Sequence, residues 1–280
     1  MKVRLWGTRG SLATPGRDTA RYGGNTSCVE VLGAEGTLLI LDAGTGIRAL
    51  GTAIPAEVER VDILLSHLHM DHILGLGFFA PLFDSRKEIH LWGPASPTSS
   101  LRGRLMRYLS APLFPVPIRD LPSRLTFHEV GSHTFQIGEF TIHAASVCHP
   151  GPTLGYRIRS RQGCMAYIPD HEPALGDRRL DLGPAWISGL SLAREVDLLI
   201  HDAQYTDSEY AERVGWGHSS VTHTLRFGEL ARPRRLVPFH HDPSHDDPTL
   251  DRLYAQARAG ASRSFEVIPA QEGARWDLGG

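Results

Sequence analysis

The 280-residue chain has little cysteine, little net charge and no long hydrophobic run. Its three cysteines are odd in number and lack the short spacings of metal ligands: Cys28, Cys148 and Cys164. This disfavours a disulfide framework and is typical of a reducing compartment, where free cysteines pack as small core residues. The longest mostly apolar run, Ile73–Phe83, is too short to cross a bilayer, which takes about 20 residues.

The charge balance and the amino terminus exclude further classes. With 29 Lys and Arg against 31 Asp and Glu, the formal charge of −2 supplies no field for wrapping long nucleic acid or binding anionic lipid. An anionic substrate must therefore meet a local positive site. The first ten residues hold no apolar stretch long enough for a signal peptide. We expect a cytoplasmic protein with neither a membrane segment nor long nucleic acid as its partner.

The hydrophobic pattern predicts short strands, many of them β-branched, and fewer helices. Strands are expected at Val29–Leu32, Thr37–Leu41, Val61–Leu65, Ile89–Trp92, Phe140–Ala144, Met165–Ile168, Val196–Ile200 and Leu236–Phe239. Helices are expected at Ile73–Pro81, Leu101–Leu109, Ile187–Ala193, Ser208–Val214, Ser220–Ala231 and Pro248–Ala259. Strands and helices do not alternate strictly, so the pattern favours an α+β or layered α/β/α arrangement over a doubly wound parallel fold.

No Gly-, Ser- or Pro-rich run marks a linker, and we expect one domain over residues 1–280. A basic helix and a proline-rich apolar loop occupy residues 94–122, where Arg102–Pro117 is hard to explain as core packing. The segment is predicted to be an insertion that forms a lid or a subunit contact, the latter in a homodimer. An ordinary surface excursion is the alternative.

Histidine is concentrated where predicted strands end. Four of them run into His67, His149, Asp170 and His240, and the first continues as His67-Leu68-His69-Met70-Asp71-His72. A lone histidine is usually a surface or satisfied core residue. Strand ends that share a sheet edge, however, bring distant residues together. Imidazole with carboxylate suits zinc, with manganese or iron as alternatives, and a site without cysteine ligands is typical of catalysis.

These residues together resemble the five-part signature of the metallo-β-lactamase superfamily, from the opening residues to about His245. The resemblance implies an αβ/βα sandwich of two mixed sheets with external helices and two divalent metals at one sheet edge. Carried over, it implies a first metal held by His67, His69 and His149, a second held by Asp71, His72 and His240, and Asp170 bridging both. His241 beside His240 leaves a one-residue shift open, and we prefer His240 because it directly follows the strand.

Two further segments resemble ribonuclease Z and related phosphodiesterases. Gly217-His218-Ser219-Ser220 matches the catalytic histidine segment, and Ile200-His201-Asp202-Ala203 matches the acidic segment that orients it. By this likeness His218 protonates the leaving alkoxide, Asp202 steadies His218, and Asp71 orients the attacking hydroxide.

The substrate expected from these likenesses is a small phosphodiester. Residues 21–28 and 240–245 resemble cyclic-nucleotide phosphodiesterases. Ribonuclease Z carries a long arm for transfer RNA where only twenty residues separate His149 from Asp170 here, and most of these form a predicted strand at Gly155–Arg159 and its turn. The sequence therefore predicts a dinuclear phosphodiesterase acting on a cyclic nucleotide. The residues predicted to line its pocket are His245, Tyr156 and Asn25.

Other functions remain open at this stage, because one fold serves many chemistries. The alternatives on this scaffold are a cyclic phosphate ester hydrolase, an exonuclease or a thioesterase. A non-enzymatic metal-binding sensor is the rival from another class, and it would need no His218–Asp202 pair.

Overall fold

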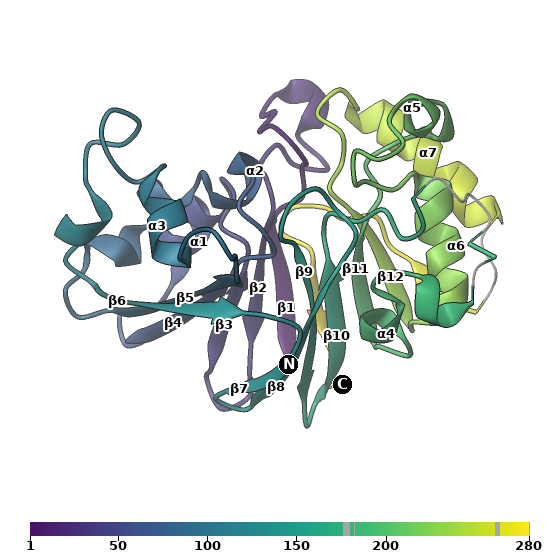
Figure 1. The fold of residues 1–280 in the computed structure, drawn as a ribbon. Coiled ribbons are helices and arrows are strands. Elements are labelled where there is room, and N and C mark those ends of the chain that lie inside the picture. The colour runs from purple at the N-terminus through teal and green to yellow at the C-terminus, as the bar shows by residue number, and fades with distance from the viewer. Residues whose placement is uncertain (176–179, 182, 261–263, 280) are drawn as a thin grey trace.

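The computed structural model describes residues 1–175, 180–181, 183–260 and 264–279. Its centre is formed by two mixed sheets of seven strands that pack face to face (Figure 1). The first sheet has the order β14 (Arg275–Asp277), β1 (Lys2–Gly7), β2 (Cys28–Leu32), β3 (Leu38–Leu41), β4 (Arg60–Leu64), β5 (Glu88–Pro94) and β6 (Arg124–Val130). The second has the order β13 (Glu266–Val267), β12 (Arg235–Phe239), β11 (Leu198–Asp202), β10 (Gly163–Ile168), β9 (Leu154–Ser160), β8 (Phe140–Ser146) and β7 (Thr134–Ile137).

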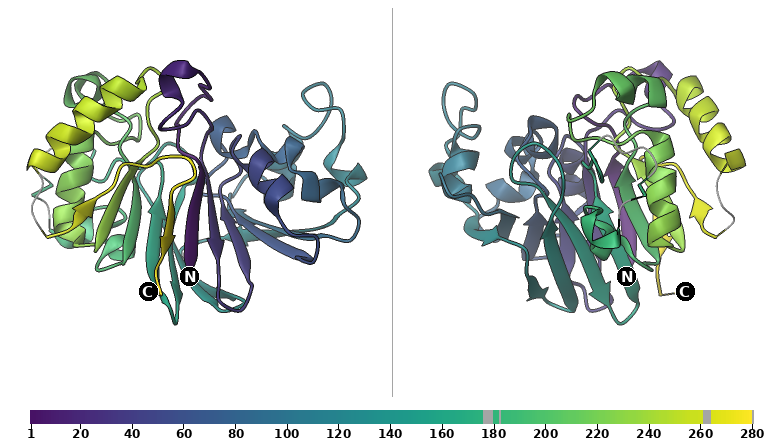
Figure 2. Two further views of the ribbon diagram at one scale, coloured as in Figure 1. Left: turned by 180° about the vertical axis from the view of Figure 1, so that it is seen from behind. Right: turned by 45° about the vertical axis from the view of Figure 1, so that its right-hand side comes forward.

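Helices cover the outer face of each sheet, as Figure 2 shows from two further directions. Their bounds are α1 (Ile47–Ala53), α2 (Met70–Ile73), α3 (Leu101–Met106), α4 (Leu190–Ala193), α5 (Asp207–Glu212), α6 (Val221–Ala231) and α7 (Asp247–Gly260). The layers explain the sequence pattern: strands buried on both faces read as continuous apolar runs, as in Leu38-Leu39-Ile40-Leu41. The described residues form four apolar clusters: one between the sheets, one under each helical layer, and a smaller one beside α7. This architecture confirms the predicted αβ/βα sandwich.

The expected strands are all present, with ends shifted by at most three residues. The pattern did not predict β1, β6, β7, β13, β14 or α1. The helix expected over Ile73–Pro81 is wrong: α2 ends at Ile73, and two short 3-10 helices follow at Leu76–Phe78 and Ala80–Phe83. At the break, the Gly75 amide donates to the Ala43 carbonyl oxygen at 2.9 Å instead of to a carbonyl of the preceding helical turn. The close approach requires glycine, since a Cβ there would lie 2.1 Å from the carbonyl oxygen of Gly44.

Residues 94–122 connect the parallel neighbours β5 and β6 and pack over the outer face of the first sheet. Tyr108 and Phe114 are buried there, so the expectation that core packing does not explain this segment is wrong for these side chains. Leu113 at its tip is 69% exposed. The lid or subunit contact stays a proposal for that tip.

Parallel pairing places the site. Strands β10, β11 and β12 run parallel, as do β3 to β6, so their carboxyl ends emerge along one edge of the sandwich. The residues that follow β4, β8, β10 and β12 include the predicted ligands. In the part of the chain that the model describes, no helix is long and apolar enough to cross a bilayer.

Candidate metal centre

The structure brings the seven predicted ligands into two adjoining groups. In each group the ligand atoms lie within 4.8 Å of one another, and Asp170 belongs to both. The first group is His67, His69, His149 and Asp170; the second is Asp71, His72, His240 and Asp170. These are the two sets that the resemblance implies.

The ring nitrogens face one another as ligands of a cation do. His72 Nε2 lies 3.2 Å from His240 Nε2, and His149 Nε2 lies 3.2 Å from His69 Nδ1. His67 Nε2 is buried and has no hydrogen-bond partner among the residues that the structure describes. Buried ring nitrogens that lack a hydrogen-bond partner cost free energy unless another group binds them. A divalent cation among the converging nitrogens would do so. The all-nitrogen-and-oxygen donor set suits zinc, manganese or iron.

The protonation states of the first group favour metal binding. Burial lowers the pKa of the His67, His69 and His149 imidazoles, so they stay neutral, the form that binds a metal. Burial opposes the charge of Asp170, yet the surrounding histidines hold its pKa well below the usual range.

In the second group the negative potential is strong. Burial opposes the charge of Asp71, but His72 and His240 hold the pKa of that carboxyl well below its usual range. Burial also opposes a charged His72, yet the carboxylates of Asp170, Asp71 and Asp42 raise its pKa well above the ordinary value. A cation at this place would meet the same field.

A second layer orients the imidazoles through their other ring nitrogens. His72 Nδ1 lies 2.7 Å from the Asp42 carboxylate, His149 Nδ1 lies 2.8 Å from the Gly217 carbonyl oxygen, and His240 Nδ1 lies 3.0 Å from Gln204 Oε1. Because carbonyl and carboxylate oxygens only accept, the facing nitrogens carry the protons and Nε2 points its lone pair into the centre.

Asp42 is the hub of this layer, and sequence reasoning missed it. It is fully buried and accepts hydrogen bonds from the amide and hydroxyl of Ser66 (2.6 and 2.8 Å) and from the Tyr167 hydroxyl (2.8 Å). The segment Asp42-Ala43-Gly44-Thr45-Gly46 was noticeable as a turn after a strand. The signal that could have found Asp42 is the acidic residue at the end of a buried strand.

Ser11 and Gln204 were also missed. The Ser11 amide donates to Asp71 Oδ2 at 2.7 Å, and Gln204 Nε2 donates to Ser11 Oγ at 3.2 Å. Neither residue type stands out in a sequence. Only the fold shows that the loop after β1 closes over the second ligand group.

His240, not His241, faces the cluster. His240 Nε2 lies 3.1 Å from Asp71 Oδ2 and 3.3 Å from Asp170 Oδ1. The His241 ring lies elsewhere, with Nε2 donating to the Ala270 carbonyl oxygen and Nδ1 2.9 Å from the Tyr254 hydroxyl. Burial lowers the pKa of His241 to about 3. The geometry therefore agrees with the preferred alternative.

His218 and Asp202 form a pair beside the ligand groups. His218 Nδ1 lies 2.7 Å from Asp202 Oδ2, and the His218 ring stacks on His240 with centroids 5.1 Å apart. Burial opposes the charged imidazole, but the Asp202 charge and hydrogen bond raise the pKa of His218 to about 9. His218 therefore carries a proton at neutral pH.

Asp202 is itself held rigidly. It is fully buried at the end of β11 and accepts hydrogen bonds from the amides of His171 (2.9 Å), Gln204 (3.0 Å) and Ser219 (3.3 Å). These three backbone donors fix the position of the carboxylate. The pair is thus preorganised to present His218 to the centre.

The predicted pocket residues fare differently. Tyr156 is a correction: it is 0% exposed in the core between the sheets, and its hydroxyl donates to the Leu65 carbonyl oxygen at 2.7 Å, so it lines no pocket. Asn25 is occupied by Thr45 and Glu272, whose side chains bond its amide group. His245 Nε2 lies 2.9 Å from Glu209 Oε1. Substrate contact by Asn25 and His245 stays a prediction.

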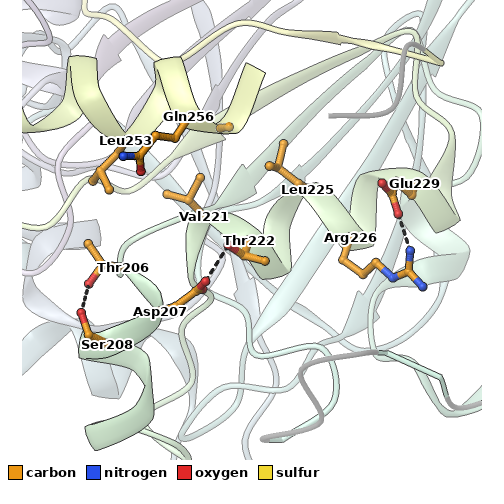
Figure 3. Close-up of a pocket in the computed structure, with 11 residues that line it drawn as sticks. Thr206, Asp207, Ser208, Val221, Thr222, Leu225, Arg226, Glu229, Leu253 and Gln256 are labelled. Atoms are coloured by element: carbon orange, nitrogen blue, oxygen red, sulfur yellow. Dashed lines mark hydrogen bonds and ion pairs between the residues drawn. The ribbon is translucent and has the colours of Figure 1, made fainter. Parts of the chain in front are cut away.

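A recess of about 500 Å³ lies among α5, α6 and α7 (Figure 3). It holds none of the predicted site residues. Asp207 at its wall accepts hydrogen bonds from the hydroxyls of Ser220 (2.6 Å) and Thr222 (2.8 Å), the first of which caps α6. We assign the wall a structural role, bracing the helix that follows His218.

Comparison with known proteins agrees with this picture. Residues 37–241 match the model of the β-lactamase superfamily domain. A curated relative, ribonuclease Z of Gemmatimonas aurantiaca, is 26% identical over 302 aligned residues, covering 92% of this chain and 90% of the relative.

Solved structures share the fold over nearly the whole chain. The metallo-β-lactamase fold protein YhfI from Bacillus subtilis has a TM-score of 0.70 at 20% identity and covers 98% of both chains. Human tRNase Z, short form, has a TM-score of 0.69 at 21% identity and covers 99% of both chains. These matches confirm the predicted fold. The curated relative supports the prediction of a hydrolase. The chain belongs to the β-lactamase superfamily.

Proposed function

We propose that this protein is a dinuclear metal-dependent phosphodiesterase acting on a small phosphodiester, such as a cyclic nucleotide. The observation that carries the proposal is the place of His218: its ring lies against His240, its Nδ1 lies 2.7 Å from Asp202, and it is 9% exposed beside both ligand groups. A hydrolase whose leaving group departs unaided would not need such a buried proton donor.

Each part of the site has a distinct task. His67, His69 and His149 would hold one metal, Asp71, His72 and His240 the other, and Asp170 would bridge them. The chemistry such metals supply when bound is activation of water and neutralisation of phosphate charge. Asp71, fixed by the Ser11 amide, orients the attacking water. His218 donates its proton to the leaving oxygen, and Asp202 stabilises the charged imidazole until it does so.

The small substrate is supported by the short chain between His149 and Asp170. That stretch is used up by a turn and the hairpin of β9 and β10, which is paired within the second sheet. The near-zero net charge also gives long nucleic acid little attraction.

RNA processing is the second candidate, because the curated relative that covers 92% of this chain is a ribonuclease Z. A panel of cyclic nucleotides, cyclic phosphates and precursor transfer RNA, assayed on metal-loaded protein, separates the two. Cleavage of RNA with no turnover of the small phosphodiesters would replace our proposal with the second candidate.

His218→Ala tests the mechanism. An alkoxide leaving group needs a proton as the P–O bond breaks, whereas p-nitrophenolate leaves without help. The variant should therefore hydrolyse the preferred alkyl phosphodiester ~100- to 10,000-fold more slowly than wild type. Its hydrolysis of bis(p-nitrophenyl) phosphate should slow far less, and its metal content should be preserved. Asp202→Asn should also slow hydrolysis of the alkyl phosphodiester more than that of bis(p-nitrophenyl) phosphate, but by a smaller factor. Equal losses on both substrates at full metal occupancy would mean that His218 positions substrate or water, and loss of metal would make it a ligand.

A further inference from the structure

The turn between α5 and His218 carries an aromatic side chain that folded proteins usually cover. Trp216 is 60% exposed, and Val214 beside it is 48% exposed. Leaving an indole in water forfeits burial free energy. The cost suggests that Trp216 contacts something other than its own chain.

The turn is nevertheless rigid. The carboxylate of Glu172, 1% exposed, accepts hydrogen bonds from the amides of Gly215 and Gly217, each at 3.0 Å, and from the Tyr210 hydroxyl at 2.7 Å. The Trp216 amide donates to the Arg213 carbonyl oxygen at 3.0 Å. The exposed indole is thus carried on a fixed backbone and loses little entropy on binding a ligand.

Gly217 joins this turn to the metal centre. Its carbonyl oxygen lies 2.8 Å from His149 Nδ1, and a Cβ on Gly217 would lie 2.5 Å from the same nitrogen. His149 is in turn 3.2 Å from His69, the exposed member of the first ligand group. The opening of the centre therefore lies at His69, and Trp216 directly precedes Gly217, the residue that contacts His149.

A cation accompanies the indole. The Arg213 guanidinium carbon lies 5.9 Å from the centroid of the Trp216 ring and 5.2 Å from that of Tyr205. Tyr205 in turn meets the His218 ring edge-on at 5.7 Å. Within the described residues no carboxylate pairs with Arg213, which donates one hydrogen bond, to the Glu209 carbonyl oxygen. Its remaining donors can meet an anion.

We propose that Trp216 and Arg213 form a nucleobase subsite at the opening of the metal centre, in which the indole stacks on the base and the guanidinium binds a phosphate oxygen. Stacking on an aromatic ring is how proteins hold unpaired bases, and it tolerates any base because each has a π-face. Arginine is suited to phosphate because its donors are planar and fixed. The inference rests on the proposed function and narrows its substrate class to phosphodiesters of nucleosides.

Binding, measured by calorimetry on metal-loaded protein, tests the subsite apart from turnover. Trp216→Ala should lower the affinity for adenosine 5′-monophosphate by about 10-fold, within the range for stacking one base. The affinity for ribose 5-phosphate, which has no base, should fall far less. Trp216→Phe should restore most of the loss. Arg213→Gln should lower the affinity for both ligands by a similar factor, because both carry phosphate. Phe78→Ala, which removes a side chain also 60% exposed, is the matched control and should change neither.

Kinetics give a second readout. Trp216→Ala should raise KM for a cyclic nucleotide more than KM for a cyclic phosphate without a base, with kcat little changed. Equal affinity of wild type and Trp216→Ala for the nucleotide would overturn the subsite, whether or not phosphodiesters are cleaved. Trp216-dependent nucleotide binding by a protein that cleaves no phosphodiester would support the subsite and overturn the proposed function.

Discussion

At the scale of single residues, the candidate metal centre depends on side chains that would touch no metal. His72 illustrates this, because its Nδ1 faces Asp42, which is also bonded by Ser66 and Tyr167. One buried carboxylate thus orients an imidazole, fixes its tautomer and adds negative potential to the second ligand group.

Asp42→Asn should therefore lower metal affinity by about 10- to 100-fold, the usual effect of losing such a partner. Wild type should bind about two divalent metals per chain, and the variant should lose the second-group metal at lower chelator concentrations. Elemental analysis and chelator titration measure both. Ser244→Ala, in an exposed loop hydrogen bond with Asp242, is a control that should leave affinity unchanged. One metal in fully loaded wild type, with no change in Asp170→Ala, would contradict the dinuclear site.

At the scale of elements, the segment of residues 94–122 has a buried base and an exposed tip, and two adjacent residues belong one to each. Phe114 is 7% exposed, meets the Phe78 ring edge-on at 5.9 Å and would lie 2.4 Å from a Cβ on Gly77. Leu113 beside it points outward and is 69% exposed. Packing therefore explains the base of this segment and leaves its tip for a lid or a subunit contact.

Two neighbouring substitutions should divide these roles. Phe114→Ala should lower the free energy of unfolding by about 3 kcal/mol, because it opens a cavity under the helical layer. Leu113→Glu should leave that free energy unchanged while raising KM or dissociating an oligomer. Urea unfolding, steady-state kinetics and mass in solution are the measurements. A Leu113→Glu protein with unaltered kinetics and mass would make the tip an ordinary surface excursion.

At the scale of the whole molecule, stability should fall in mild acid because histidines are buried uncharged. Burial lowers the pKa of His201 to about 4 from 6.5. His201 is 0% exposed, its Nδ1 donates to the Asp202 carbonyl oxygen, and its Nε2 lies 2.9 Å from His171 Nδ1. Between pH 6.5 and 4 the unfolded chain binds a proton at this residue that the native state does not, so stability decreases as pH falls.

The contribution of His201 to this loss should reach about 3 kcal/mol, at 1.36 kcal/mol per pKa unit. His201→Gln removes the titration, so the gap in unfolding free energy between wild type and variant should narrow by up to that amount from pH 7 to pH 4. Urea unfolding at each pH, with a chelator present to remove metal effects, measures the gap. Parallel curves would show that His201 is not the group responsible.

The sequence by itself determined the central strands of each sheet, most of the helices and the identity of the clustered side chains. His67, His69, Asp71 and His72 lie within six residues, so their proximity is local. His149, Asp170 and His240 follow predicted strands. Asp170 and His240 meet at one edge because β10, β11 and β12 run parallel. His149 reaches the same edge because two antiparallel pairings give β8 the direction of β10. These features depend on periodicity and chain order, which a sequence displays directly.

The tertiary structure decided what those side chains face. Asp42 and His72 are 30 residues apart and Gln204 and His240 are 36 apart, and no local pattern links either pair. His240 follows the end of β12 with φ 64°, and its ring faces the cluster while that of His241 faces Ala270. Pairing of β9 within the second sheet places Tyr156 in the core. Orientation depends on packing from several elements at once, because buried polar atoms take whichever partner the fold brings within reach. The same holds for Trp216, which is exposed on a turn that Glu172 holds through the amides of Gly215 and Gly217.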